Sequence, residues 1–144
     1  MEQAGGAPPP ATVLLVEDDP RIASFLSKGF LREGFRFEWI STGREALVRL
    51  DEGGIDVLLL DLGLPDVDGL QVLREARERG LDLPVIIVTG RSDPRDRVVA
   101  LSLGVMAYLT KPFPWADLLA KVRAAVDQAT SPRTGDALGR PDQG

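Results

Sequence analysis

Val13-Leu14-Leu15-Val16-Glu17-Asp18-Asp19-Pro20 is the stretch that decides the fold of this chain. Its four apolar residues follow one another without interruption, which is typical of a strand buried on both faces, because a half-exposed strand alternates apolar and polar residues. Three carboxylates end the run, and Pro20 follows at a position that suits the first turn of a helix. The stretch predicts a strand over about 12–17 and then a helix capped by Asp18 or Asp19.

Three further apolar runs also end at a polar residue, and a fifth strand is expected at Phe35–Ile40. Five strands alternating with five helices predict an α/β fold, in which a parallel sheet carries helices on both faces. The three runs are Val57–Leu60 followed by Asp61, Val85–Val88 followed by Thr89, and Ala107–Leu109 followed by Thr110 and Lys111.

The helical segments between these strands have recognisable start and stop signals. The first begins at Pro20 and ends before Gly34, a residue type that favours a left-handed C-terminal position. Its apolar residues recur at the spacing of one helix face. The other helices are expected to begin near Thr42, Gly69, Pro94 and position 114, and to end near Gly53, Gly80, Gly104 and position 127. The expected inner face of the first helix consists of Ile22, Phe25, Leu26, Gly29 and Phe30.

Two segments outside this alternation have no apolar periodicity. Residues 1–10 are rich in glycine, alanine and proline, and we expect a disordered N-terminal tail. Residues 128–144 contain many helix breakers and are expected to form a flexible tail or a linker. The sequence therefore predicts a single folded domain over residues 11–127.

The composition excludes several kinds of chemistry. The 144 residues include no cysteine and no histidine, which excludes disulfides, thiolate or imidazole metal sites and Ser-His-Asp triads. The formal net charge of −5 argues against a nucleic-acid binder. No apolar stretch reaches the roughly 20 residues of a membrane helix, and the N-terminus lacks the pattern of a signal peptide. We expect a cytoplasmic protein with no membrane partner.

The carboxylates after the first and third strands are candidate ligands for a cation. Ligands bind an open parallel sheet at the carboxyl ends of its strands, so Glu17, Asp18 and Asp61 are expected to lie together there, facing Lys111. A lone carboxylate at such a place is usually a helix cap, but a cap needs only one acid. Several acids together repel one another unless a hard cation lies between them. We expect a divalent cation beside Asp61, which keeps one oxygen free for in-line attack on phosphorus.

Two residues at other strand ends complete the expected site. Thr89 is either a plain strand-end hydroxyl or a donor to a phosphoryl oxygen. Lys111 can pair with Asp61 before phosphorylation and with the phosphoryl group afterwards. The Lys111–Pro112 bond is a candidate cis peptide. The other acids nearby are expected to have structural positions: the far end of the third strand for Asp56, and the N-terminus of the third helix for Asp66 and Asp68.

The sequence resembles a bacterial response-regulator receiver domain over roughly residues 11–127. This resemblance implies a flavodoxin-like, doubly wound sheet of five parallel strands in the order 2-1-3-4-5. It also implies Mg²⁺, or Mn²⁺, as the cofactor. Four motifs at four strand ends carry the resemblance: Val-Glu-Asp-Asp-Pro at 16–20, Asp-Leu-Gly-Leu-Pro-Asp-Val-Asp-Gly at 61–69, Val-Thr-Gly at 88–90 and Tyr-Leu-Thr-Lys-Pro-Phe at 108–113.

Each site residue takes a role from the same resemblance. Asp61 is the phosphoacceptor, and Asp18 is a direct ligand of the metal. Glu17 acts on the metal through water, and the backbone carbonyl of Gly63 completes the protein ligands. The switch and phosphate-binding residues implied in this way are Thr89, Tyr108 and Lys111.

The implied function is that of a phosphoacceptor switch. Asp61 takes a phosphoryl group from a histidine kinase or a phosphotransfer protein, after which Thr89 and Tyr108 turn inward. The face formed by the fourth helix, the fifth strand and the fifth helix then binds an output partner that the sequence does not identify. Such a protein catalyses only its own phosphorylation and dephosphorylation, so we do not expect an enzyme that acts on a separate substrate.

Three alternatives remain open. The chain could be a pseudo-receiver that binds a partner without phosphorylation, or the receiver part of a longer DNA-binding transcriptional regulator. It could also be an aspartate-nucleophile phosphatase. Such enzymes resemble the pattern Asp-x-Asp, however, and here Gly63 occupies the place of the second acid. No output domain follows the fifth helix in the sequence, so we expect no direct nucleic-acid binding by this chain.

Two residues near the phosphoacceptor are expected to set how long a phosphoryl group survives. Gly63 and Arg91 lie two positions after Asp61 and after Thr89, and both should flank the path of the hydrolytic water. Glycine has no side chain to position that water, and the arginine could screen the phosphoryl group. These residues predict slow autodephosphorylation.

The expected output face departs from that of receivers in winged-helix transcription factors. Met106 and Ala107 occupy positions where those receivers carry acidic residues, whose basic partners here would be Lys121 or Arg123. Because an exposed ion pair contributes only ~0–1 kcal/mol, the loss weakens pairing between copies without forbidding it. We expect a monomer or a weak dimer. The face is predicted to comprise Arg97 and Asp117 as the remaining ion pair, with Met106, Ala107 and Trp115 as its apolar part.

Overall fold

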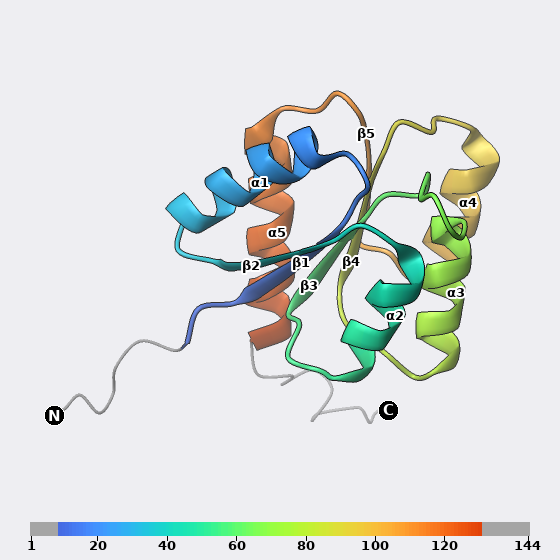
Figure 1. Ribbon diagram of the computed structural model, residues 1–144, viewed down its shortest axis with the longest axis horizontal. Coiled ribbons are helices and arrows are strands. Elements are labelled where there is room, and N and C mark those ends of the chain that lie inside the picture. The colour runs from blue at the N-terminus through green and yellow to red at the C-terminus, as the bar shows by residue number, and fades with distance from the viewer. Residues whose placement is uncertain (1–8, 131–144) are drawn as a thin grey trace, which may run out of the picture.

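The computed structural model describes residues 9–130. Most of the two predicted tails, residues 1–8 and 131–144, lies outside the described residues. Strands and helices alternate throughout the described part of the chain (Figure 1). The strands are β1 (Thr12–Val16), β2 (Arg36–Ile40), β3 (Val57–Leu60), β4 (Val85–Thr89) and β5 (Ala107–Thr110). The helices are α1 (Pro20–Arg32), α2 (Gly43–Asp51), α3 (Gly69–Glu78), α4 (Pro94–Ser102) and α5 (Trp115–Thr130).

The five strands form one parallel sheet in the order β2-β1-β3-β4-β5. The flavodoxin-like fold and the strand order predicted from the sequence are therefore confirmed. In the sheet register Val16 lies beside Leu60, and Leu60 lies beside Ile87. The carboxyl ends of the central strands consequently come out at one edge of the sheet, where Glu17 and Asp61 follow directly.

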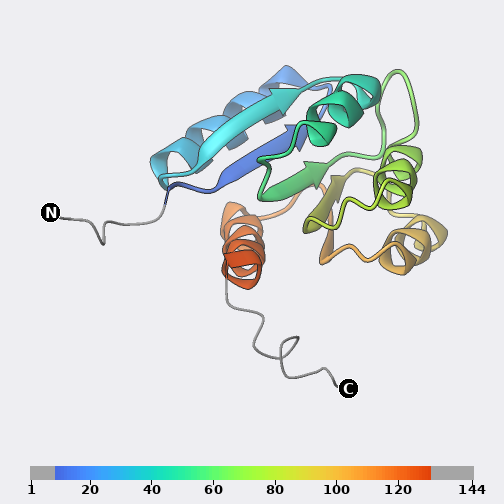
Figure 2. The same ribbon diagram turned by 90° about the horizontal axis from the view of Figure 1, so that it is seen from below.

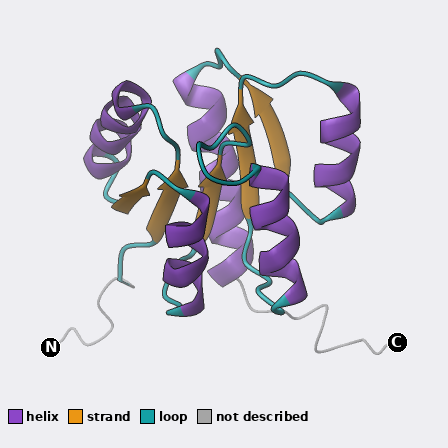
Figure 3. Cartoon of the chain, turned by 45° about the vertical axis from the view of Figure 1, so that its right-hand side comes forward, coloured by secondary structure: helices purple, strands orange, loops and turns teal. Residues whose placement is uncertain are grey.

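The helices cover both faces of the sheet, α1 and α5 on one side and α2, α3 and α4 on the other (Figures 1, 2 and 3). Alternate residues of each central strand point to opposite faces. In β1, Leu14 and Val16 pack toward α2 and α3, whereas Val13 and Leu15 pack toward α1 and α5. Both faces of β1, β3 and β4 are thus buried, which explains why these strands are continuous apolar runs.

The helix ends follow the predicted signals with few exceptions. Asp19, one of the two candidate caps, accepts a hydrogen bond from the backbone N–H of Arg21, and Pro20 occupies the first turn of α1. Gly34, after the end of α1, has a φ of 90°, a value that glycine adopts without strain. α5 extends beyond the expected end at 127, to Thr130.

One member of the predicted inner face of α1 was assigned wrongly. Phe25 is 58% exposed, whereas Leu26 and Phe30 are fully buried. The Phe25 ring instead makes an edge contact with Trp115 at the start of α5, with ring centroids 6.2 Å apart. It lies at the border of the apolar stripe, where a large ring covers a neighbour from outside.

Within residues 9–130, no helix combines the length and the apolar character that crossing a membrane requires.

Candidate functional site

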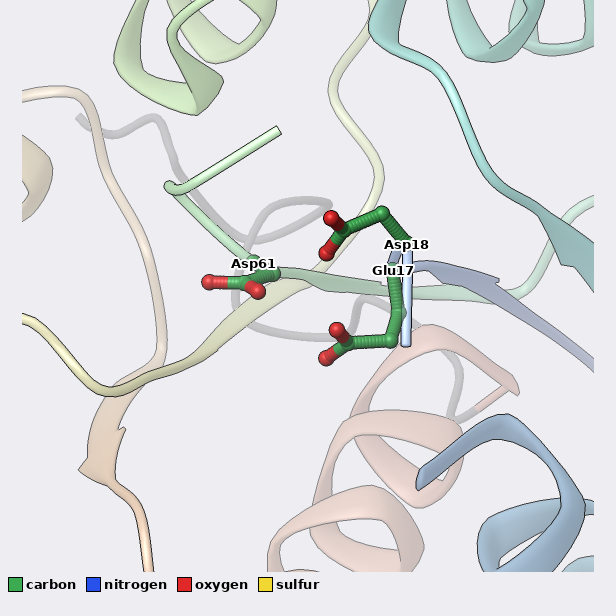
Figure 4. A group of neighbouring side chains, drawn as sticks. All are labelled: Glu17, Asp18 and Asp61. Carbon is green, nitrogen blue, oxygen red and sulfur yellow. The ribbon is translucent and has the colours of Figure 1, made fainter. Parts of the chain in front are cut away.

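Three carboxylates meet where β1 and β3 end. Glu17 and Asp18 follow β1, Asp61 follows β3, and one oxygen from each lies within 4.8 Å of the others. Figure 4 shows the three side chains directed into the same space. Glu17 and Asp61 are 1% and 6% exposed, while Asp18 lies open to solvent. The structure thus brings together the three acids that the sequence placed at this edge.

Lys111 reaches this cluster from the end of β5. Its ammonium Nζ lies 2.7 Å from Glu17 Oε1 and 3.2 Å from Asp61 Oδ2. Burial alone would lower the pKa of Lys111. The hydrogen bond to Glu17 and the charges of both carboxylates act in the opposite direction and outweigh burial, so the net shift of the pKa is upward. The Lys111–Pro112 bond is cis, as predicted. A charged lysine therefore faces the two buried acids.

The remaining hydrogen bonds fix the buried carboxylates. The backbone N–H of Gly63 donates to Asp61 Oδ1 over 3.1 Å, and that of Asp19 donates to Glu17 Oε2 over 3.0 Å. Burial raises the pKa of Glu17, the hydrogen bond from Lys111 opposes this shift, and the nearby charge of Asp61 adds to it. Among residues 9–130, the Asp18 carboxylate has no hydrogen-bond partner, so its oxygens are free to bind a ligand.

This donor set fits a hard divalent cation. The cluster offers only carboxylate oxygens, which Mg²⁺ prefers over nitrogen or sulfur ligands. Its like charges also repel one another, and a bound cation relieves that repulsion. Asp18, exposed and without a hydrogen bond from the described residues, would be a direct ligand, and Asp61 would be a second. Glu17, already bonded to Lys111 and Asp19, is better suited to a contact through water.

Gly69 keeps the segment after Asp61 close to α3. Its N–H donates to the carbonyl of Leu62 over 2.8 Å. A Cβ at position 69 would lie 2.5 Å from the carbonyl oxygen of Asp61 and 2.6 Å from Cα of Leu62. Both are backbone atoms that cannot yield without moving Asp61, so only glycine permits this approach.

The other acids near β3 take separate positions. Asp56 lies at the opposite end of β3, as predicted, and its Oδ2 accepts from the N–H of Thr12 over 2.7 Å. Asp68 caps α3, also as predicted. The prediction for Asp66 is wrong, because this residue binds the N-terminus of α2 through the N–H groups of Gly43 and Arg44. A helix terminus distant in sequence but near in space supplies its hydrogen bonds.

Thr89 and Tyr108 lie on the opposite side of the cluster from β2. The Thr89 side chain is buried at the end of β4, and its Oγ1 accepts from the N–H of Arg91 over 3.2 Å. Tyr108 is only 6% exposed, and its hydroxyl donates to the carbonyl of Arg91 over 3.0 Å. The guanidinium of Arg97 lies over the Tyr108 ring, 5.5 Å from its centroid. The candidate switch tyrosine is therefore already directed inward.

The predicted output face is only partly present as described. Met106 is 39% exposed, and Arg97 and Asp117 are exposed as well. Ala107 is partly buried against the α1 and α5 side of the core. Trp115 was assigned to this face wrongly, because its ring packs on Phe30 and over Gly29 of α1, where a Cβ would lie 2.6 Å from the ring.

Arg123 also lies away from the output face, since it forms an ion pair with Glu33 after α1. α5 has apolar and charged residues on more than one side, so its sequence alone does not show which side meets α1. Gly29 gives the only local hint, because it leaves the space that the Trp115 ring fills.

Trp39, on the edge strand β2, is a site residue that the sequence reasoning missed. Its indole N–H donates to the backbone carbonyl of Glu17 over 2.6 Å. The register could have revealed this contact, since Trp39 pairs with Leu15, two residues before Glu17. The partners of the Arg91 side chain, Asp68 and Asp96, were missed as well.

The comparison with known families agrees with this geometry. The model of the response regulator receiver domain family matches residues 13–123. The transcriptional regulatory protein TrcR of Mycobacterium tuberculosis is 39% identical over 130 residues, which cover 90% of this chain and 50% of that protein. The regulatory protein PcoR of Escherichia coli is 36% identical over 119 residues, covering 83% of this chain and 53% of PcoR. The chain thus spans about half the length of these relatives.

Solved structures show the same fold. A receiver domain protein from Methanospirillum hungatei has a TM-score of 0.79 and 29% identity, covering 83% of this chain and 96% of that chain. The response regulator TrrA of Thermotoga maritima, solved in complex with Mg²⁺ and BeF, has a TM-score of 0.72 and 29% identity, with 80% and 98% covered. With four matching strand ends and this fold, the chain belongs to the response-regulator receiver domain family.

Proposed function

We propose that this chain is a phosphoacceptor switch in which Asp61 receives a phosphoryl group. One observation carries the proposal: the buried Asp61 carboxylate lies between the N–H of Gly63 and the ammonium of Lys111, beside two further acids. A purely structural aspartate does not require two further acids beside it, because their like charges destabilise it. A nucleophile that needs a metal and a cation beside it requires all of these groups.

The transfer step balances without any further reactant. A carboxylate oxygen of Asp61 attacks the phosphorus of a phosphohistidine, an O–P bond forms, and the P–N bond breaks. The imidazole leaves with the electron pair and takes a proton from solvent. Lys111, whose Nζ lies 3.2 Å from Asp61, and the hydroxyl of Thr89 would bind the phosphoryl oxygens, to which both can donate. A bound Mg²⁺ supplies charge that offsets the negative charge of the phosphoryl group during the transfer.

The donor and the output partner belong to this proposal too. A histidine kinase or a phosphotransfer protein supplies the phosphoryl group. The relatives named above are transcriptional regulators, and this chain matches about half of each, which favours an output through gene regulation, either by a longer version of this chain or by a separate partner. The proposed output surface comprises the exposed Val98, Leu101 and Met106 of α4 and the α4–β5 connection, with Arg97 beside them.

Acetyl phosphate labelling tests the function. Wild type incubated with acetyl phosphate and Mg²⁺ should gain one phosphoryl group in intact-mass spectra, and EDTA should prevent the gain. Asp61→Asn should abolish it. Asp56→Asn is the matched control, because Asp56 lies at the other end of β3 and an amide oxygen can still accept from Thr12. No labelling of a folded, Mg²⁺-binding wild type would favour the pseudo-receiver.

The oligomeric state follows from the same surface. Arg97 contacts the carbonyl and the ring of Tyr108, so its guanidinium is partly engaged within its own chain. We propose that the chain remains a monomer, or at most a weak dimer, when beryllofluoride and Mg²⁺ activate it. Sedimentation equilibrium at micromolar concentration measures this. A tight dimer that dissociates in Arg97→Ala would contradict the proposal.

A further inference from the structure

Arg91 lies at the centre of a network that joins four parts of the fold. Its guanidinium forms a bidentate ion pair with Asp68, at 2.9 and 3.4 Å, and a second bidentate pair with Asp96, at 3.2 and 3.3 Å. It also donates to the carbonyl of Leu62 over 3.4 Å. All of these contacts leave only about a third of the side chain exposed, at 34%.

The partners of this guanidinium stand at the start of two helices. Asp68 caps α3, and Asp96 lies in the first turn of α4. The hydrogen bonds of both aspartates raise the pKa of Arg91, burial opposes this shift, and the charges of the aspartates add to it, so the net shift is upward. A planar guanidinium suits such paired contacts better than any other side chain. The Arg91 side chain therefore fastens the β4–α4 loop to both α3 and α4.

The backbone of the same residue holds the two candidate switch side chains. The N–H of Arg91 donates to Thr89 Oγ1, and its carbonyl accepts from the hydroxyl of Tyr108. The loop that presents this carbonyl contains Gly90, whose backbone is the most permissive of any residue. The place of the carbonyl consequently depends on how firmly the Arg91 side chain is held.

We propose that Arg91 is a positioning residue that keeps Tyr108 buried through the loop carbonyl to which the phenol donates. The clamp formed by Arg91, Asp68 and Asp96 fixes the loop, the loop fixes the carbonyl, and the carbonyl holds the phenol. The clamp's partners are the two aspartates and the carbonyl of Leu62, and none of these is a carboxylate of the acidic cluster. The position of Tyr108 is then set by the anchoring of the β4–α4 loop.

The single tyrosine of this chain allows a direct test. Protein labelled with 3-fluorotyrosine gives one ¹⁹F resonance, which reports on Tyr108 alone. Samples contain neither Mg²⁺ nor a phosphoryl donor, so the result does not depend on phosphorylation of Asp61. Slightly acidic buffer keeps the fluorophenol protonated. A neutral gadolinium chelate measures its exposure through relaxation enhancement.

The chemical shift of the wild-type resonance should differ from that of free fluorotyrosine, and the chelate should enhance its relaxation only weakly. In Arg91→Ala it should move toward the free value, with relaxation enhanced several-fold. Arg91→Lys should lie between, because a lysine cannot hold both aspartates in paired contacts. Arg95→Ala is the matched control, since Arg95 forms a comparable pair with Asp93 but does not touch the loop carbonyl. This control should behave as wild type.

An unchanged, shielded resonance in folded Arg91→Ala would overturn the proposal, because it would mean that packing under Arg97 holds Tyr108 alone. Circular dichroism establishes whether the variant folds. If it does not, Asp96→Asn removes one half of the clamp with little change of shape and should give the intermediate exposure. Wild-type shielding in both Asp96→Asn and Arg91→Lys would likewise overturn it.

Discussion

Lys111 lies closer to Glu17 than to Asp61, although 94 positions of sequence separate Lys111 from Glu17. Its Nζ is 2.7 Å from Glu17 Oε1, and the Glu17 side chain is 1% exposed. The lysine thus offsets one of the three negative charges in the cluster and leaves two, which matches the charge of a divalent cation. Lys111 therefore offsets the energetic cost of burying the Glu17 carboxylate, because an unpaired buried carboxylate is strongly unfavourable.

Lys111→Ala should separate stability from metal binding. Without Mg²⁺ the free energy of unfolding should fall by about 1–3 kcal/mol, since two acids lose their donor. Mg²⁺ affinity should persist or rise, because the substitution removes a positive charge from the site. Urea unfolding and calorimetric titration measure the two quantities, and Lys28→Ala, at an exposed position of α1, is the control. A parallel loss of Mg²⁺ binding and phosphorylation would show that Lys111 mainly holds the site together.

Trp39 should report on the metal site and help to shape it. The indole N–H fixes the carbonyl of Glu17, next to the proposed metal ligand Asp18, so Mg²⁺ binding should change tryptophan fluorescence. Trp39→Phe should remove this response and weaken Mg²⁺ binding by no more than about tenfold, the equivalent of one hydrogen bond. Trp115→Phe should keep the response, because Trp115 packs on α1. A response that disappears in Trp115→Phe instead would contradict the assignment.

Gly63 should govern the lifetime of the phosphoryl group. A Cβ at position 63 would meet only Asp61 Oδ1, at 4.0 Å, so a side chain has room beside the phosphoacceptor. Gly63→Asn adds an amide that can orient a water molecule, and loss of phosphate should accelerate several-fold. Gly63→Ala adds a Cβ without the amide and should leave the rate near that of wild type. The rate is measured as the loss of the phosphoryl mass with time. Equal rates in wild type, Gly63→Asn and Gly63→Ala would refute this role.

The free energy of unfolding should decrease at alkaline pH because of Tyr108. Burial of the phenol raises its pKa, and the charge of Asp96 acts in the same direction. The protonated phenol is neutral, so a folded pKa above the unfolded value of about 10 favours the folded state. That contribution is complete below the unfolded pKa and disappears as the pH rises through the folded one. Ultraviolet titration of this sole tyrosine should show an upward-shifted transition with parallel loss of thermal stability; a transition at the ordinary pKa would contradict the burial.

The fold and the acidic cluster could be predicted because each depends on a local pattern. Val57–Leu60 was located to the residue, since Asp56 and Asp61 bound an uninterrupted apolar run. Once strands are ordered in a parallel sheet, residues that follow their carboxyl ends must be neighbours. Glu17, Asp18, Asp61 and Lys111 required no information beyond that rule.

Contacts that depend on side-chain direction could not be predicted in this way. The sequence does not show which side of α5 carries Trp115, because this depends on how the helix rotates against α1. Asp66 binds a helix that is distant in sequence, and the sequence does not show which of the nearby acids pair with Arg91. Such choices follow from the packed structure, in which loops far apart along the chain become adjacent.

Reductive mapping of the phosphorylated residue tests the central claim most directly. Borohydride converts an aspartyl phosphate to homoserine, which peptide mass spectrometry locates. After treatment with acetyl phosphate and Mg²⁺, homoserine should replace Asp61 and no other acid. Its appearance at Asp18 or Asp19, or at no aspartate in a protein that has gained the phosphoryl mass, would contradict the assignment of Asp61 as the phosphoacceptor.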